Sequence, residues 1–285
     1  MTPLRQQMID AMQQRGFSDR THKSYLDAVR RLAKHFHKPP DQLQQEQNQE
    51  YFVYLVKERH LSAASCKLYL NGIRFLYLQV LKWKSFDVPI QTPKRPQKIP
   101  ELLTRHEVKQ IINACENSRH RLMLLTCYGC GLRVSELVAL KVRHVDGERQ
   151  LLRVEQGKGS KDRAVVLSAA LLEQLRHYWK KEHPRLWLFP NRSRPHLHLN
   201  ITTIQKVFRT AKDKTGIQKI GGIHSLRHAY ATHQLESGLP VYVLQQQLGH
   251  GDIHSTMHYV HWLALSHGET SPVADLVEQL EAGHE

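Results

Sequence analysis

The stretch GCGLRVSELVAL, residues 129–140, joins a glycine-rich turn to the first turn of an expected helix. Arg133 stands where this helix begins, and Glu136 follows three residues later. An arginine at a helix start can direct its planar set of donors at an anion, while the helix amides add positive potential. Taken alone, the pattern is more typical of an ordinary turn in which the two residues pair. An anion site is indicated only if other segments supply further groups.

Two further segments carry cationic side chains. GKGSKDR, residues 157–163, sets Lys158 between glycines at an expected hairpin tip, where backbone amides can approach a ligand closely. It lacks the GxxxxGK[ST] pattern of a P-loop. HSLRHAYATH contains His224, Arg227 and His228, and the first two can share a helix face that suits an anionic phosphate. Each segment alone also fits a plain surface turn or helix.

The last motifs add an imidazole and a phenol. LGH ends at His250, and Tyr259 follows nine residues later. The combined set fits phosphoryl transfer through a covalent enzyme intermediate without a metal: arginines neutralise the non-bridging oxygens, the tyrosine attacks, and a cationic acid protonates the departing 5′ oxygen. The candidate catalytic residues are Arg133, Lys158, His224, Arg227, His250 and Tyr259.

A metal site is the main alternative for the histidines. His250, His254 and His258 recur at four-residue spacing and could line a helix as ligands. Cys127 and Cys130 form a single CxxC within apolar sequence, and no HExxH is present. Because buried thiols and surface imidazoles account for these residues, neither a metal nor another cofactor is expected.

The composition favours some classes of protein and excludes others. The 285 residues are 40% hydrophobic and 24% charged, which is typical of a soluble globular chain. No apolar run reaches the ~18 residues of a membrane span, and the polar N-terminus lacks a signal core. Four cysteines do not suggest a disulfide framework, so a cytoplasmic location without membrane contact is expected. The net charge of +15 favours nucleic acid as the partner.

The first 88 residues are expected to form an all-helical bundle of about four helices. Ser62 can cap a helix that continues to residue 80, and further helices are predicted over 4–14 and 49–59. The apolar face of the remaining helix is predicted to be Tyr25, Val29, Leu32, Ala33 and Phe36. Basic residues on its polar side are expected to contact DNA phosphates, with a solvated helix face as the alternative: Arg30, Arg31 and Lys34.

A proline-rich segment, PIQTPKRPQKIPELLT, follows from residue 89 to residue 104. Prolines at this density cannot continue a helix and favour an extended path. We interpret residues 89–103 as an interdomain linker that tracks a DNA backbone, with a plain surface loop as the alternative. The basic residues of this linker are Lys94, Arg95 and Lys98.

After the linker the chain is expected to be mostly helical with one small sheet. Thr104 and Glu107 form a capping box that opens a helix. Residues 150–156 and 163–167 alternate or run apolar around GKGSKD, which predicts an antiparallel hairpin. The predicted fold class is therefore mainly α with a small antiparallel β-sheet. Helices are predicted over residues 104–115, 119–128, 134–140, 168–181, 202–214, 225–237, 240–248 and 252–265.

The order and combination of these motifs resemble the tyrosine recombinases, or phage-type integrases. GLRVSEL, GKGSKDR, HSLRH, LGH and the tyrosine nine residues further on look most like the Xer-type and integron-type branch. Without an extra segment before HSLRH, the integron type is the less favoured of the two. The resemblance implies a core-binding, SAM-like DNA-binding domain over 1–88, the linker over 89–103 and a catalytic domain over 104–269.

The resemblance also implies the main chemical roles. Tyr259 would be the nucleophile and would form a 3′-phosphotyrosyl link, so that rejoining needs neither ATP nor a metal. Arg133 and Arg227 would hold the scissile phosphate. Lys158 would be the general acid for the 5′-hydroxyl leaving group.

Three further residues would support the reaction. His224 would assist proton transfer, and His250 would hydrogen-bond the phosphate or orient the site. Glu136 would support the pocket by bracing Arg133 or a histidine. Two departures from the family pattern, the cysteines before GLR and the extra histidines around the tyrosine, make redox or metal sensitivity a hypothesis.

The resemblance implies partners and an assembly as well. The expected partners are double-stranded DNA recombination sites, joined through a Holliday junction by a homotetramer that is a monomer or dimer off DNA. Accessory proteins are left open. The acidic tail, residues 270–285, carries a short apolar helical stripe that would dock onto a neighbouring protomer, with packing in cis as the alternative. Two other functions stay open: DNA binding without catalysis, and relaxation by a type IB topoisomerase.

Overall fold

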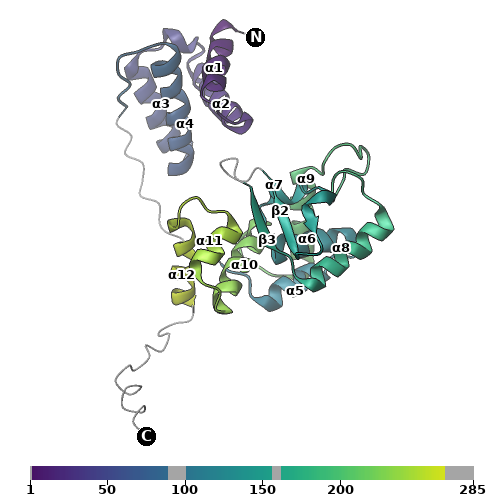
Figure 1. Cartoon of the computed structure of the whole chain (residues 1–285). Coiled ribbons are helices and arrows are strands. Elements are labelled where there is room, and N and C mark those ends of the chain that lie inside the picture. Colours follow the sequence, from purple (N-terminus) through teal and green to yellow (C-terminus); the bar gives the residue numbers. More distant parts are fainter. Residues whose placement is uncertain (1, 89–100, 156–161, 267–285) are drawn as a thin grey trace, which may run out of the picture. The chain divides into compact units, whose positions relative to one another are not determined.

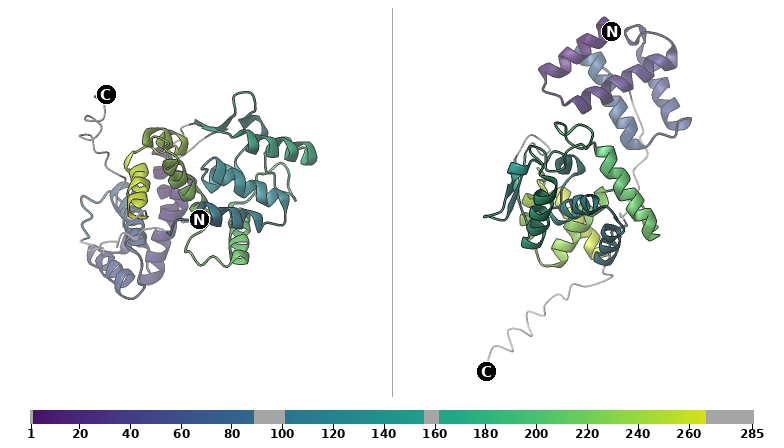
Figure 2. Two further views of the ribbon diagram at one scale, coloured as in Figure 1. Left: turned by 90° about the horizontal axis from the view of Figure 1, so that it is seen from below. Right: turned by 90° about the vertical axis from the view of Figure 1, so that its right-hand side faces the viewer.

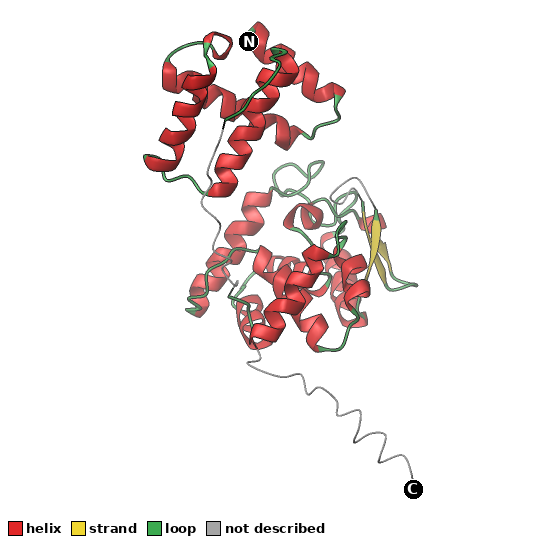
Figure 3. Cartoon of the chain, turned by 90° about the vertical axis from the view of Figure 1, so that its left-hand side faces the viewer, coloured by secondary structure: helices red, strands yellow, loops and turns green. Residues whose placement is uncertain are grey.

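The computed structural model describes residues 2–88, 101–155 and 162–266, the last three of them as backbone only. The chain divides into two compact units, Met1–Lys98 and Ile99–Glu285. Both consist mainly of helices, and the described strands form one small sheet in the second unit (Figure 3). The predicted fold class is therefore confirmed. No helix within the described ranges is long and apolar enough to cross a membrane.

The first unit is a helical bundle whose helices begin at serine caps in two places. The hydroxyl of Ser18 accepts a hydrogen bond from the backbone of Thr21, and that of Ser62 from the backbone of Ser65. The predicted cap at Ser62 is thus confirmed. The elements of this unit are α1 (Pro3–Gln14), α2 (Asp19–Phe36), η1 (Pro40–Gln42), α3 (Gln45–Lys57), α4 (Ala63–Phe75) and a π-helical continuation, η2 (Leu76–Val80) (Figure 1).

Helix α2 contributes residues to two core clusters. It packs so closely on α4 that a Cβ on Gly72 would lie 3.0 Å from the Cα of Tyr25. Its buried residues are Leu26, Ala28 and Leu32, so of the predicted apolar face only Leu32 is fully buried. Tyr25, Val29 and Phe36 of the predicted face are half-buried against the same clusters, and the additional core residues are Leu26, which clusters with α1, and Ala28, which clusters with α3 and α4.

The second unit packs its helices against one face of a three-stranded antiparallel sheet of order β1-β2-β3 (Figures 2 and 3). The predicted hairpin is confirmed: β2 (Leu151–Val154) pairs with β3 (Arg163–Val166), although the tip, residues 156–161, lies outside the described residues. The two-residue β1 (Val145–Asp146) was not predicted, because so short a segment shows no alternation. The helical elements are α5 (Arg105–Asn113), α6 (Ser118–Gly129), α7 (Val134–Val138), η3 (Val142–His144), α8 (Ala169–Glu182), α9 (Ile201–Thr215), α10 (His224–Glu236), α11 (Val241–Leu248) and α12 (His254–Ser266).

Two local features connect the sequence motifs to this fold. The capping box is confirmed, with the Thr104 amide donating to Glu107 at 2.7 Å and the Glu107 amide donating to the Thr104 hydroxyl at 3.2 Å. Gly131, after α6, has a φ of 57°, and a Cβ there would lie 2.4 Å from the ring of Tyr230. Only glycine fits this turn, which lies against Tyr230 of α10 and places Arg133 at the N-terminus of α7.

Candidate active site

A buried carboxylate, Glu136 on α7, connects three parts of the second unit. It accepts hydrogen bonds from the amide and Nη1 of Arg133 at 2.8 and 2.7 Å, and from both terminal nitrogens of Arg163 at 2.8 Å. Its side chain is 4% exposed. Burial alone would raise the pKa of this carboxyl, but the hydrogen bonds and charges of Arg163 and Arg133 lower the pKa to about 2. Glu136 is therefore an anion that hydrogen-bonds Arg133 and Arg163, and its Oε2 also lies 3.8 Å from Nη1 of Arg227 on α10.

Arg163, the first residue of β3, was not among the predicted site residues. Besides Glu136 it binds the carbonyl of Gln247 through Nε at 2.8 Å. Gly249 leaves room for it, because a Cβ on this residue would lie 2.8 Å from the Arg163 Cδ, and its φ is 63°. The available signal was position alone: Arg163 ends GKGSKDR, and Gly249 is the glycine of LGH. The two motifs meet in the fold.

The second predicted arginine, Arg227 on α10, is fixed by backbone carbonyls. Its Nη1 donates to the carbonyl of Gly131 and its Nη2 to that of Leu248, both at 2.7 Å. Nη2 also lies 3.0 Å from Nε2 of His250. Burial and then the charge of Arg133 lower the pKa of Arg227 to about 10, so the guanidinium remains charged at neutral pH.

The tautomer of His250 follows from its partners. Because a guanidinium only donates, Nε2 of His250 must accept from Arg227. Nδ1 then carries the proton and donates to the Thr256 hydroxyl at 2.9 Å. The imidazole is thus held in one orientation between α10 and α12.

The predicted nucleophile, Tyr259 on α12, lies beside this group and is 4% exposed. Its ring is parallel to that of His250, with centroids 6.2 Å apart, and its hydroxyl lies 3.0 Å from Nδ1 of His228. Burial raises the pKa of Tyr259, while Arg227 and Arg133 act in the opposite direction. Helices α10, α11 and α12 lie side by side, so the tyrosine reaches the arginines of its own chain (Figure 1).

Both histidines of HSLRH face the same region. The side chain of His224 keeps an exposed surface, but the packed protein around the rest of the ring and the charges of Arg227 and Arg133 lower its pKa. His228 is more enclosed, and burial, followed by His224 and Arg227, lowers its pKa to about 4. Each imidazole is therefore neutral at neutral pH.

The other predicted residues lie elsewhere. Lys158 and the linker residues Lys94, Arg95 and Lys98 fall outside the described residues, as does the tail over 270–285. On α2, Arg30 and Arg31 both pair with Asp27, and Lys34 is exposed. These three belong to the first unit.

The alternative metal ligands make other contacts. His250 binds Arg227 and Thr256, and His254 binds Asp252 at 2.8 Å. No group of three His, Cys, Asp or Glu side chains in the described parts of the chain is arranged to hold a metal ion. The thiols of Cys127 and Cys130 are buried, which raises the pKa of each to about 12.

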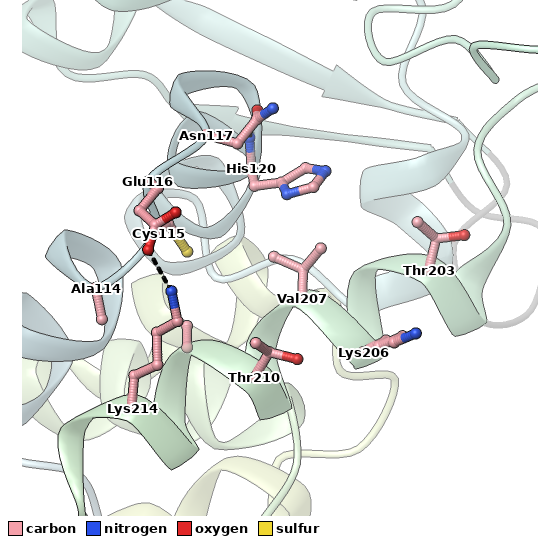
Figure 4. A pocket seen from close by; sticks show the side chains of 11 residues that line it. Ala114, Cys115, Glu116, Asn117, His120, Thr203, Lys206, Val207, Thr210 and Lys214 are labelled. Carbon is pink, nitrogen blue, oxygen red and sulfur yellow. Dashed lines mark hydrogen bonds and ion pairs between the residues drawn. The ribbon is translucent and has the colours of Figure 1, made fainter.

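The second unit also has a hollow of about 370 Å³ between α9 and the segment that joins α5 to α6. Lys214 and Glu116 form an ion pair across it, and Lys206 and His120 line it (Figure 4). Its lining residues include none of the predicted catalytic residues. The candidate active site is therefore the group around Glu136, Arg227 and Tyr259, and not this hollow.

Comparison with known proteins assigns the family. A model described as the phage integrase family matches residues 101–265, and one described as the N-terminal SAM-like domain of phage integrases matches residues 4–85. The chain belongs to the phage integrase family. It is 42% identical over 262 residues to an integrase/recombinase of Sinorhizobium fredii, which covers 91% of this chain and 84% of that protein. It is 36% identical over 197 residues to the tyrosine recombinase XerA of Pyrococcus horikoshii, 68% of each chain.

The predicted resemblance is thereby confirmed, and the chain is by family a tyrosine recombinase, a site-specific DNA strand transferase. Its structure is similar to that of a lambda integrase dimer bound to a core site, with a TM-score of 0.69 at 21% identity, over 86% of this chain and 89% of that one. That likeness supports the fold. The comparisons do not favour a DNA-binding protein without catalysis or a type IB topoisomerase.

Proposed function

We propose that this chain recombines specific DNA sites by cutting and rejoining each strand through a 3′-phosphotyrosine at Tyr259. One observation carries the proposal: four separate segments bring Arg133, Arg227, His250 and Tyr259 together, and both arginines contact a single buried carboxylate, Glu136. A protein that only binds DNA has no need of a buried tyrosine beside two arginines. The related recombinases and integrases support the same activity.

The two arginines would hold the non-bridging oxygens of the scissile phosphate. Arg133 is 19% exposed, and among the described residues its Nη2 makes one 3.3 Å hydrogen bond, to the carbonyl of Gly249, which a phosphate oxygen would replace. Arg227 directs Nη2 toward His250, and a phosphate oxygen would bind there beside the imidazole. Removing one such preorganised donor typically costs about 10²–10³-fold in rate.

Proton transfer would be divided between the two sides of the phosphate. The Tyr259–phosphorus bond forms as the bond to the 5′ oxygen breaks, and the phosphotyrosine conserves the bond energy, so that no ATP is consumed. Lys158 would protonate the 5′ oxygen, and His224 would assist. Because β3 begins at Arg163, which binds Glu136, the strand that follows Lys158 in the sequence is attached to the site at its first residue.

Cleavage would occur in cis. Helix α12 packs on α10 and α11 of the same unit, and Tyr259 contacts His228 of its own chain. The nucleophile therefore approaches a phosphate held by Arg227 of the same protomer.

DNA would be contacted by both units and by the linker. The net charge of +15, the exposed basic side of α2 and the basic linker support this role. Binding should weaken steeply with salt, because each phosphate contact releases counterions. We further propose that the protein acts in the cytoplasm as a tetramer on two DNA sites. The tail over 270–285 would dock onto a neighbouring protomer, and accessory proteins would join this complex.

The test compares recombination with relaxation. A plasmid bearing two copies of the DNA that flanks the gene for this chain is incubated in EDTA with wild type or Tyr259→Phe, next to a one-site plasmid. Wild type should exchange the segments of the two-site plasmid, and the variant should bind without cutting. Relaxation of both plasmids without exchange would support a topoisomerase instead. Binding by both proteins with no cut DNA would overturn catalysis.

A further inference from the structure

The hydroxyl of Tyr259 is hydrogen-bonded to a histidine that lies next to the phosphate-holding arginine. Oη of Tyr259 is 3.0 Å from Nδ1 of His228, across the contact between α12 and α10. Trp262 packs edge-on against both rings, with centroid distances of 5.2 Å to Tyr259 and 5.7 Å to His228. The Trp262 ring thus packs against both partners of the hydrogen bond.

A phenol that attacks phosphorus must lose its proton. Since burial raises the pKa of Tyr259, this residue is protonated before the reaction and needs an acceptor. His228 is neutral, because burial and then His224 and Arg227 lower its pKa to about 4. A neutral imidazole has one lone pair to accept a proton, and 3.0 Å is within the reach of a general base.

The other candidate bases near the tyrosine are engaged elsewhere. The Nε2 lone pair of His250 accepts from Arg227, and its Nδ1 donates to Thr256. The carboxylate of Glu136 is bound by two arginines. Within the described residues, the geometry therefore selects His228.

We propose that His228 is the general base of strand cleavage, an inference that rests on the proposed function of Tyr259. As the bond between Oη and phosphorus forms and the bond to the 5′ oxygen breaks, the phenol proton moves to Nδ1 of His228 and the 5′ oxygen takes a proton from Lys158. In rejoining, the 5′-hydroxyl returns its proton to Lys158, and the imidazolium returns its proton to Tyr259. A phosphate bound to Arg227 offsets a positive charge beside His228, so substrate makes the imidazole more basic.

The test uses the full chain and a suicide duplex whose 5′ bridging oxygen at the cleaved bond is replaced by sulfur. A thiolate leaves without being protonated, so the sulfur substrate restores cleavage to a variant that lacks the general acid. Lys158→Ala and His228→Ala should each cleave the oxygen substrate about 10²–10⁴-fold more slowly than wild type. Sulfur should restore the rate for Lys158→Ala only, and restoration for His228→Ala would overturn the proposal.

A conservative variant separates proton transfer from positioning. His228→Asn keeps an acceptor oxygen near Nδ1 but cannot take the proton, so it should cleave as slowly as His228→Ala while retaining DNA binding. The matched control is His233→Asn on the same helix, where His233 binds Tyr128 at 2.9 Å, and this variant should cleave normally. A near wild-type rate for His228→Asn would reduce His228 to a positioning residue. Adduct formation by Tyr259→Phe would instead contradict the proposed function itself.

Discussion

Replacing Glu136 with glutamine removes the negative charge that holds Arg133 and Arg163 in position. The pKa of this carboxyl falls from 4.5 to about 2 in the folded chain. A pKa difference of that size means that folding favours the ionised carboxyl by roughly 3 kcal/mol. Removing one partner of a buried ion pair typically costs a similar free energy. Glu136→Gln should therefore destabilise the second unit by roughly 3 kcal/mol at pH 7.

The pH dependence gives the sign of the effect. Because the pKa is lower in the folded state, the stabilisation by Glu136 is fully present above about pH 4.5 and is lost as the pH falls toward about 2. The difference in the free energy of unfolding between wild type and Glu136→Gln should be constant from pH 7 to 5 and should decrease below pH 4.5. Hydrogen exchange of peptides from α6 and α10 in urea measures this difference for the second unit alone.

The matched control is Glu116→Gln, which breaks the exposed ion pair with Lys214 and should leave the stability of the second unit almost unchanged, because solvent screens a surface pair. Equal stability of Glu136→Gln and wild type at pH 7 would refute the reasoning, and so would a difference that does not change below pH 4.5. Cleavage by Glu136→Gln should also slow by about 10²-fold, since Arg133 loses its fixed position.

Three other predictions concern geometry and assembly. Gly249→Ala should destabilise the chain and slow cleavage at least about tenfold, because the added Cβ would push against Arg163. The control Gly216→Ala also has a positive φ but has open space around it, so it should lower the free energy of unfolding in urea by only about 1 kcal/mol and leave the cleavage rate unchanged. A mixture of Tyr259→Phe and Arg227→Ala should form no adduct on a gel, and restored cleavage would indicate attack in trans. Deleting residues 270–285 should impair synapsis more than single-site binding in a gel-shift assay, and unaffected synapsis would reject docking in trans.

The parts of the fold that could be predicted were the helices whose start or periodicity is encoded by neighbouring residues. The capping box at Thr104, the serine cap at Ser62 and the helical periodicity each act within a few residues, and all three appear in the structure. On α2 the periodic pattern located Leu32 and the half-buried Tyr25, Val29 and Phe36, but it did not show that this face would meet two separate clusters, because only the tertiary packing determines that. Strand β1 is too short for any periodic pattern.

The site was predictable where a motif supplied the reacting group. Arg133, Arg227, His250 and Tyr259 were selected from motifs and are gathered in one place. The role of Arg163 was not predictable, because its two-pronged contact with Glu136 joins residues 27 positions apart. The contact between His228 and Tyr259 spans two helices, and only the tertiary structure shows it.

The covalent bond at Tyr259 tests the account most directly. Nicked duplexes taken from DNA flanking the gene for this chain are incubated with wild type in EDTA, the adduct is digested with nuclease and protease, and the peptide that carries the nucleotide is sequenced by mass spectrometry. The account predicts a 3′-nucleotide on Tyr259, and no adduct with Tyr259→Phe. A nucleotide on another residue, or equal adduct with the variant, would contradict it.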